Sequence, residues 1–167
     1  MISKVIKAFF SSYHGPKHVE TKLLKEGKWL RLKSASFDSR GKRINDYEFV
    51  ERTTKRGAFD GIDVVGIVKY PETKQENQLI LIASYRPPID QYILEFPAGL
   101  IDGAHANCVE DAIRELKEET GYTASSEISL LSNYKSSILS PILYGDPWKS
   151  NEAGKIVALE VNGDDPQ

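Results

Sequence analysis

Apolar and polar residues alternate along several short stretches of the chain, and one stretch instead repeats with helical spacing. Alternation with a period of two is typical of β-strands that bury one face, and β-branched residues strengthen that prediction. On this basis strands are predicted at residues 29–37, 44–53, 62–70, 78–85, 92–96, 128–134 and 156–161. Turn residues at 38–41 predict a connection between the first two strands.

The helical stretch lies between Asn107 and Gly121. Apolar residues recur there at i, i+3, i+4 and i+7, which predicts a helix with one buried face. That face consists of Val109, Ala112, Ile113 and Leu116. Asn107, with Glu110 three residues later, has the side chain of a helix N-cap. Gly121 is the residue type that ends helices in the left-handed conformation.

Three carboxylates lie close together on this predicted helix. Glu115, Glu118 and Glu119 fall within an arc of about 100°. Like charges at this spacing repel, and a cation between them would reverse the sign of the interaction. Oxygen ligands of this kind suit Mg²⁺ or Mn²⁺. The alternative is a solvated acidic face on which Arg114 pairs with Glu118.

Composition is that of an ordinary globular domain. The 167 residues are 40% apolar and 28% charged, and the formal net charge is −2. This charge gives no reason to expect a nucleic-acid partner. No apolar run reaches 18 residues, so no membrane span is expected. Cys108 is the single cysteine, which excludes an intrachain disulfide and a cysteine-rich zinc site.

Residues 1–24 are interpreted as a separate N-terminal segment. The first nineteen residues contain lysines but no acid, and five apolar residues could share one helical face. A flexible or partner-docked segment is the favoured interpretation, which places the protein in the cytoplasm or the nucleus. An organellar presequence, with a mitochondrial destination, is the alternative.

Two motifs resemble a known family. Glu95-Phe96-Pro97-Ala98-Gly99-Leu100-Ile101-Asp102 is followed, after a loop, by Arg114-Glu115-Leu116-Lys117-Glu118-Glu119-Thr120-Gly121. Together they resemble the signature of the Nudix hydrolases. The upstream run Tyr85-Arg86-Pro87-Pro88 narrows the resemblance to the branch that hydrolyses ADP-ribose and nucleotide sugars. The resemblance extends over about residues 27–165.

The resemblance implies an α/β protein, with an α/β/α sandwich around a mixed sheet over residues 25–167 and dimerisation strands at about 28–54. It also implies a metal site on the predicted helix. Glu115 and Glu119 would be the main ligands, Glu118 would assist, and the carbonyl of Ala98 would be a further ligand. Arg114 would orient these acids rather than touch the substrate.

Substrate contacts are implied by the same resemblance. In this branch two aromatic residues from different subunits sandwich the adenine, and the matching positions are Trp29 and Tyr47. Arg52 and Arg86 match residues that grip the diphosphate or ribose, and Leu100 matches an apolar contact. A homodimer is therefore expected. The alternative for Trp29 is an ordinary aromatic residue in the core.

The sequence departs from the family pattern in two places. Gly99 and Arg114 are fifteen positions apart instead of the usual fourteen, and a glutamate of the intervening loop is absent. The chain also stops at Gln167, so the family's usual C-terminal strand and helix are expected to be missing. A loop glutamate that activates the attacking water in relatives has no match here.

The resemblance implies Mg²⁺-dependent hydrolysis of ADP-ribose to AMP and ribose 5-phosphate, with other nucleoside diphosphate sugars as further substrates and Mn²⁺ as an alternative to Mg²⁺. The alternative is a weak or inactive module that binds nucleotide sugars, or that acts as a regulatory or dimerising subunit. Neither prediction involves nucleic acid or a membrane.

Overall fold

The computed structural model describes residues 15–55, 57–101, 107–124 and 139–164. They form two compact units, which we treat separately. The described residues up to Thr53, with Asp146–Asn151, make the first, and the remainder make the second. The sequence instead predicted a boundary after residue 24, between an N-terminal segment and the main domain. No helix in these ranges is long and apolar enough to cross a membrane.

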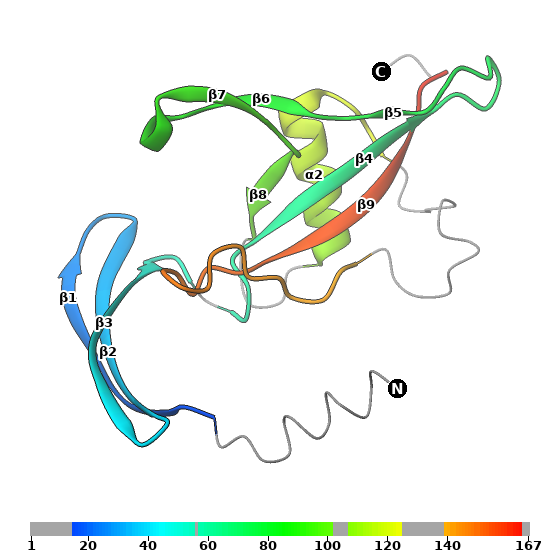
Figure 1. Ribbon diagram of the computed structural model, residues 1–167. Coiled ribbons are helices and arrows are strands. Elements are labelled where there is room, and N and C mark those ends of the chain that lie inside the picture. Colours follow the sequence, from blue (N-terminus) through cyan, green and yellow to red (C-terminus); the bar gives the residue numbers. More distant parts are fainter. Residues whose placement is uncertain (1–14, 56, 102–106, 125–138, 165–167) are drawn as a thin grey trace, which may run out of the picture. The chain divides into compact units, whose positions relative to one another are not determined.

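The first unit is a three-stranded antiparallel sheet (Figure 1). Its strands, in spatial order, are β1 (Lys17–Glu26), β2 (Leu30–Ser39) and β3 (Lys42–Arg52). Arg40 and Gly41, both with positive φ, form the turn between β2 and β3 where the sequence predicted one. Residues 146–151 run beside β3, with a backbone hydrogen bond from Val50 to Lys149.

The apolar pattern predicted β2 and β3 but not β1. Every residue of β1 is exposed, so no buried face imposes an alternation on its sequence. Its position follows instead from backbone pairing with β2, from Lys17 opposite Asp38 to Glu26 opposite Arg31. Residues 17–24, which the sequence assigned to an N-terminal segment, therefore lie in a paired strand.

The second unit is organised around β4 (Gly61–Lys69). β9 (Gly154–Asn162) pairs with β4 in parallel over nine positions. β8 (Ala98–Leu100) and β5 (Gln78–Leu79) pair with β4 in the antiparallel sense. β6 (Ile82–Arg86) and β7 (Gln91–Glu95) form a hairpin around the 3₁₀ turn Pro87–Ile89. The predicted mixed sheet is confirmed.

α2 (Cys108–Thr120) covers one face of this sheet and is the single α-helix in the part of the chain that is described (Figure 1). The core between them contains Ile62, Val64, Val68, Ala112, Leu116, Val157, Leu159 and Val161. Of the predicted buried face, Ala112 and Leu116 are fully buried, and Val109 and Ile113 pack at its margin.

The predicted ends of this helix are confirmed. The Asn107 side chain accepts a hydrogen bond from the Val109 N–H at 3.2 Å. Gly121 adopts φ 81° and donates its N–H to the carbonyl of Lys117. These contacts satisfy backbone groups that a helix end otherwise leaves unpaired.

The predicted strand at 78–85 is interrupted at Ile80. Its N–H donates to the carbonyl of Gly66, and its side chain is buried against that glycine, where an added Cβ would lie 3.0 Å from Ile80 Cδ1. The chain then leaves β4 to enter the β6–β7 hairpin. One alternating stretch of sequence therefore forms two strands, β5 and β6, which belong to different sheets. The period of the pattern alone does not reveal this change of partner. The predicted strand at 128–134 lies outside the described residues.

Asp60, directly before β4, joins the residue after β8 to the residue before β9. Its N–H donates to Ala153 O, its carbonyl accepts from Ile101, and its carboxylate accepts from the Ala153 N–H. Lys55 neutralises this buried carboxylate at 2.8 Å. These contacts hold the neighbouring Ala98–Leu100 strand in place against β4.

Candidate active site

Gly99 lies directly against Glu115. A Cβ built on Gly99 would be 1.9 Å from Glu115 Cδ and 2.1 and 2.3 Å from the two carboxylate oxygens. The space that any other side chain needs at position 99 is therefore occupied by this carboxyl group. The pairing of β8 with β4 sets Gly99 opposite Ile62, on the sheet face that α2 covers.

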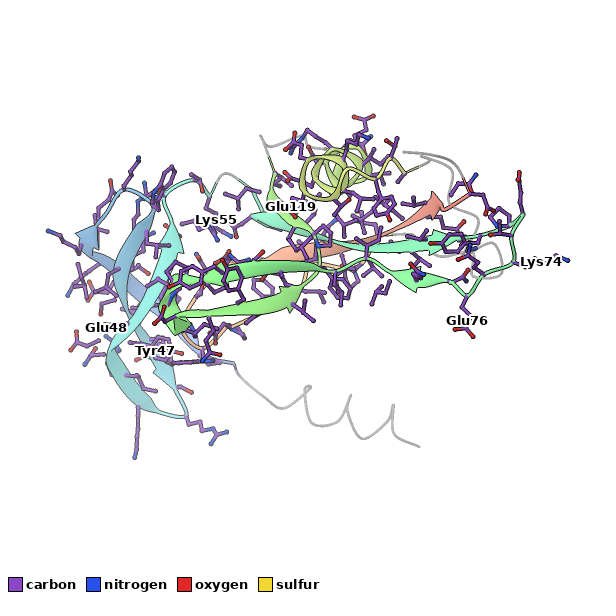
Figure 2. All side chains as sticks on the ribbon, turned by 90° about the horizontal axis from the view of Figure 1, so that it is seen from above. Tyr47, Glu48, Lys55, Lys74, Glu76 and Glu119 are labelled. Carbon is purple, nitrogen blue, oxygen red and sulfur yellow. The ribbon has the colours of Figure 1, made fainter. Side chains whose placement is uncertain are left out.

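Glu119 reaches the same β8 strand one turn further along α2. Its Oε2 accepts a hydrogen bond from the backbone N–H of Ala98 at 3.0 Å. Figure 2 shows Glu119 between the helix and the strands. The i, i+4 spacing predicted from the sequence thus brings Glu115 and Glu119 to two consecutive residues of β8.

Arg114 forms hydrogen bonds with two acids of the same helix. Its guanidinium donates to Glu115 Oε1 at 2.7 Å and to Glu118 Oε2 at 3.1 Å. The hydrogen bond to Glu115, then that to Glu118, raises the pKa of Arg114 above its ordinary value. Glu118 is more exposed than Glu115, with 59% against 12% of its side chain accessible. Both the pairing of Arg114 with Glu118 and its contact with a predicted ligand are therefore present.

The donor chemistry of this site fits a hard divalent cation. Carboxylate and carbonyl oxygens are the ligands that Mg²⁺ and Mn²⁺ prefer, and the Glu115 and Glu119 carboxylates both lie against β8 at Ala98 and Gly99. Within the described ranges, no three Asp, Glu, Cys or His side chains converge in a ready-made metal site. Arg114 and the Ala98 N–H partner the acids in this arrangement.

Arg86 and Leu100 also belong to the second unit. The Arg86 guanidinium makes a bidentate pair with Glu95, with Nε to Oε2 at 3.1 Å and Nη2 to Oε1 at 2.6 Å. The Arg86 side chain is 53% exposed, and the pair with Glu95 uses two of its five N–H donors. Leu100, at the end of β8, has an exposed side chain, as a ligand contact requires.

Trp29, Tyr47 and Arg52 belong to the first unit. Trp29 is 61% exposed, so its alternative interpretation as a core residue is wrong. Tyr47 is partly exposed, lies edge-on to Phe37 with 5.8 Å between ring centroids, and donates its hydroxyl to Trp148 O. Figure 2 labels Tyr47 beside its neighbour Glu48.

The two predicted base-stacking residues are far apart within the chain. Tyr47 is opposite Ala35, whereas Arg52 is opposite Leu30, the residue after Trp29. Trp29 is therefore six residues from Ala35, which corresponds to about 20 Å along an extended chain. A purine ring is much shorter than this separation, so Trp29 and Tyr47 of the same chain do not face one adenine.

Comparison with known proteins identifies the family. A sequence profile described as the NUDIX domain matches residues 62–167. The chain belongs to the Nudix family. The family predicted from the Glu95–Asp102 and Arg114–Gly121 motifs is thereby confirmed. The matched range contains α2, the Ala98–Leu100 strand and the β6–β7 hairpin, and it does not contain the β1–β3 sheet.

The relatives of this Nudix chain include two eukaryotic pyrophosphatases. It is 34% identical over 153 residues to the ADP-sugar pyrophosphatase of Mus musculus, covering 89% of this chain and 64% of that protein. It is 33% identical over 150 residues to the ADP-ribose pyrophosphatase of Saccharomyces cerevisiae, covering 87% of this chain and 60% of that protein. The chain thus spans less than two thirds of the length of either relative.

A solved structure supports the Nudix fold. The crystal structure of an ADP compounds hydrolase matches 93% of this chain and 76% of its own, with a TM-score of 0.60 and 22% identity. At this identity the match establishes the fold alone. It extends over most of the chain, beyond the range that the family profile matches.

Two features of this Nudix site were not predicted from the sequence. Glu95 lies in the first motif, but its pairing with Arg86 does not follow from the motif, because the two residues are nine positions apart. The available signal is the opposite charges of Arg86, directly after the predicted strand 78–85, and Glu95, within the predicted strand 92–96. The contact between Gly99 and Glu115 joins residues sixteen positions apart, and only the presence of glycine in the motif pointed to it.

Proposed function

We propose that this Nudix chain hydrolyses the diphosphate bond of ADP-ribose and related nucleoside diphosphate sugars, giving AMP and ribose 5-phosphate from ADP-ribose. The observation that carries the proposal is the contact of two α2 carboxylates with β8, Glu115 against Gly99 and Glu119 at the Ala98 N–H. The names of the mouse and yeast relatives support the substrate class.

A divalent cation is part of the proposal. Glu115, Glu119 and the carbonyl of Ala98 would hold Mg²⁺ or Mn²⁺, and Glu118 would assist. The bound cation would neutralise diphosphate charge and lower the pKa of a coordinated water. Gly99 leaves room for the Glu115 carboxylate, and Arg114 orients Glu115 and Glu118 from the helix surface.

Arginines bind the anionic part of the substrate in this proposal. A guanidinium presents a planar set of N–H donors that matches phosphate oxygens. Arg86 keeps N–H donors beyond those in its pair with Glu95, which supports a role at the diphosphate. Arg52 is assigned to the diphosphate or the adjoining ribose, and Leu100 to an apolar contact.

The base site is proposed to need two copies of the chain. Trp29 is exposed and Tyr47 is partly exposed, as stacking on adenine requires, but the register of β2 and β3 separates them. Trp29 of one copy and Tyr47 of another would then enclose one base. The homodimer is proposed on this ground.

A second candidate is a module that binds nucleotide sugars without turnover. It is favoured by the partners that the acids already have, since Arg114 is bonded to Glu115 and Glu118 and the Ala98 N–H to Glu119. A substrate and a cation would have to compete with these contacts. No acid of the described chain is assigned to activate the attacking water.

Two measurements on the 167-residue chain separate these candidates. Incubation with ADP-ribose and Mg²⁺ is followed by chromatography of AMP, and calorimetry measures ADP-ribose binding in Ca²⁺ or EDTA. AMP release that stops when EDTA is added supports the enzyme. Binding without AMP release supports the sensing module. A folded chain that neither binds ADP-ribose nor releases AMP would rule out both candidates.

A further inference from the structure

Arg86 and Glu95 are joined along the face of the β6–β7 hairpin. Arg86 is opposite Gln91 beside the turn, whereas Glu95 is opposite Ile82 at the far end. Positions 82 and 86 differ by four, so both side chains leave the same face. The pair is bidentate, at 3.1 and 2.6 Å.

This contact displaces the charge of Arg86 along the hairpin. Four strand positions separate the two backbone sites by about 13 Å. Because the guanidinium and carboxylate are in contact, both side chains run toward each other over Ser84. The cation therefore lies away from the hairpin turn and nearer the end of β7. Glu95 is three residues before Ala98, where the Glu119 carboxylate is bound.

The surroundings of Glu95 favour its charged form. Partial burial by itself raises the pKa of Glu95, but hydrogen bonds from Arg86 and Ser84 and the Arg86 charge outweigh it, so the pKa is below its ordinary value. Asp63, opposite Ala98 in the sheet, has a raised pKa because of burial and then because of the Glu95 charge. Arg86 thus compensates one of two neighbouring acids.

We propose that Glu95 is a positioning residue, which directs the Arg86 guanidinium toward the Ala98–Gly99 segment so that its free donors meet the substrate diphosphate. The inference rests on the proposed function for its substrate. Glu95 occupies two of the five N–H donors of the guanidinium, and the rest remain for phosphate oxygens. The role of Glu95 is to fix one cation that would otherwise move with the flexible arginine side chain.

The orientation of Arg86 can be measured without turnover. In protein carrying ¹⁵N-labelled arginine, NMR reads the hydrogen exchange rate of the Arg86 Nε–H, which donates to Glu95. We expect exchange to accelerate at least about tenfold in Glu95→Ala, with Glu95→Gln intermediate because it keeps one acceptor oxygen. Glu76→Gln removes a charge from the exposed loop between β4 and β5, at the opposite end of the second unit from the β6–β7 turn (Figures 1 and 2), and is the matched control. Exchange rates in both Glu95 variants equal to those of the parent would overturn the proposal.

The consequence for the substrate is tested with a double-mutant cycle. Glu95→Gln is expected to raise KM for ADP-ribose on the order of tenfold, and to have little effect in the Arg86→Ala background, where no cation remains to be positioned. Equal effects of Glu95→Gln in both backgrounds would contradict positioning through Arg86. If the parent binds ADP-ribose but releases no AMP, the same cycle is measured on Kd. A chain that does neither disproves the proposed function, while the exchange measurement still decides whether Glu95 orients Arg86.

Discussion

Gly99 affects the chemistry proposed for the site through the side chain that it lacks. Its missing side chain leaves the space that Glu115 fills, with 1.9 Å between the hypothetical Cβ and Glu115 Cδ. The sequence predicted Glu115, Glu118 and Glu119 because their helical spacing is regular. It did not predict which residues of β8 contact Glu115 and Glu119, since those partners lie sixteen or more residues away.

Substitution of Gly99 by alanine separates activity from stability. The added methyl group must displace the Glu115 carboxylate, which is the mobile end of a side chain, so the free energy of unfolding should change by less than about 1 kcal/mol. Displacing a metal ligand by an ångström or more should lower kcat/KM about a hundredfold. Denaturant unfolding and AMP release on the same sample measure both. A stable, fully active Gly99→Ala would show that Glu115 needs no fixed position.

At the scale of elements, α2 was the most predictable part of the chain. Its apolar period, the N-cap Asn107 and the terminal Gly121 all indicate the same thirteen-residue helix. Prediction was poorest where a strand has no buried face, as in β1, and where one run changes partners, as at Ile80 between β5 and β6. Both failures concern tertiary contacts that local periodicity does not encode.

The N-cap of α2 gives a quantitative test. Asn107→Ala removes the acceptor of the Val109 N–H and should lower the free energy of unfolding by about 1 kcal/mol. Asn107→Asp keeps a capping oxygen and places a negative charge at the helix N-terminus, so its stability should equal or exceed that of the parent. Urea titrations compare the three proteins. Equal losses in both variants would mean that the side chain acts through something other than the cap.

For the whole molecule, the motifs predicted the Nudix fold, and the comparisons confirm it. The division into two units was not predicted, because residues 146–151 join the first unit from a distant part of the sequence. The same limitation applies to the base site. Trp29 and Tyr47 were named from the resemblance, and only the register of β2 and β3 reveals that one chain keeps them apart.

A mixing experiment tests the two-copy base site. Trp29→Ala and Tyr47→Ala should each weaken ADP-ribose turnover, because each removes one stacking surface from every site. When the two variants are unfolded together and refolded at equal amounts, half of the dimers are mixed, and each has one site with both aromatics. About one quarter of the sites should therefore recover parental kinetics. Activity equal to the mean of the separate variants would contradict a shared site.

We propose that the α2 carboxylates at β8 carry out metal-dependent hydrolysis of a nucleoside diphosphate sugar. The most direct test is the rate of AMP release from ADP-ribose with Mg²⁺ by the parent, Glu119→Gln and the exposed-loop control Glu76→Gln. The amide oxygen in Glu119→Gln can still accept the Ala98 N–H, so the fold should persist while a charged ligand is lost. We predict a parental rate for Glu76→Gln and a loss on the order of a hundredfold or more for Glu119→Gln. Near-parental AMP release by Glu119→Gln would contradict the claim.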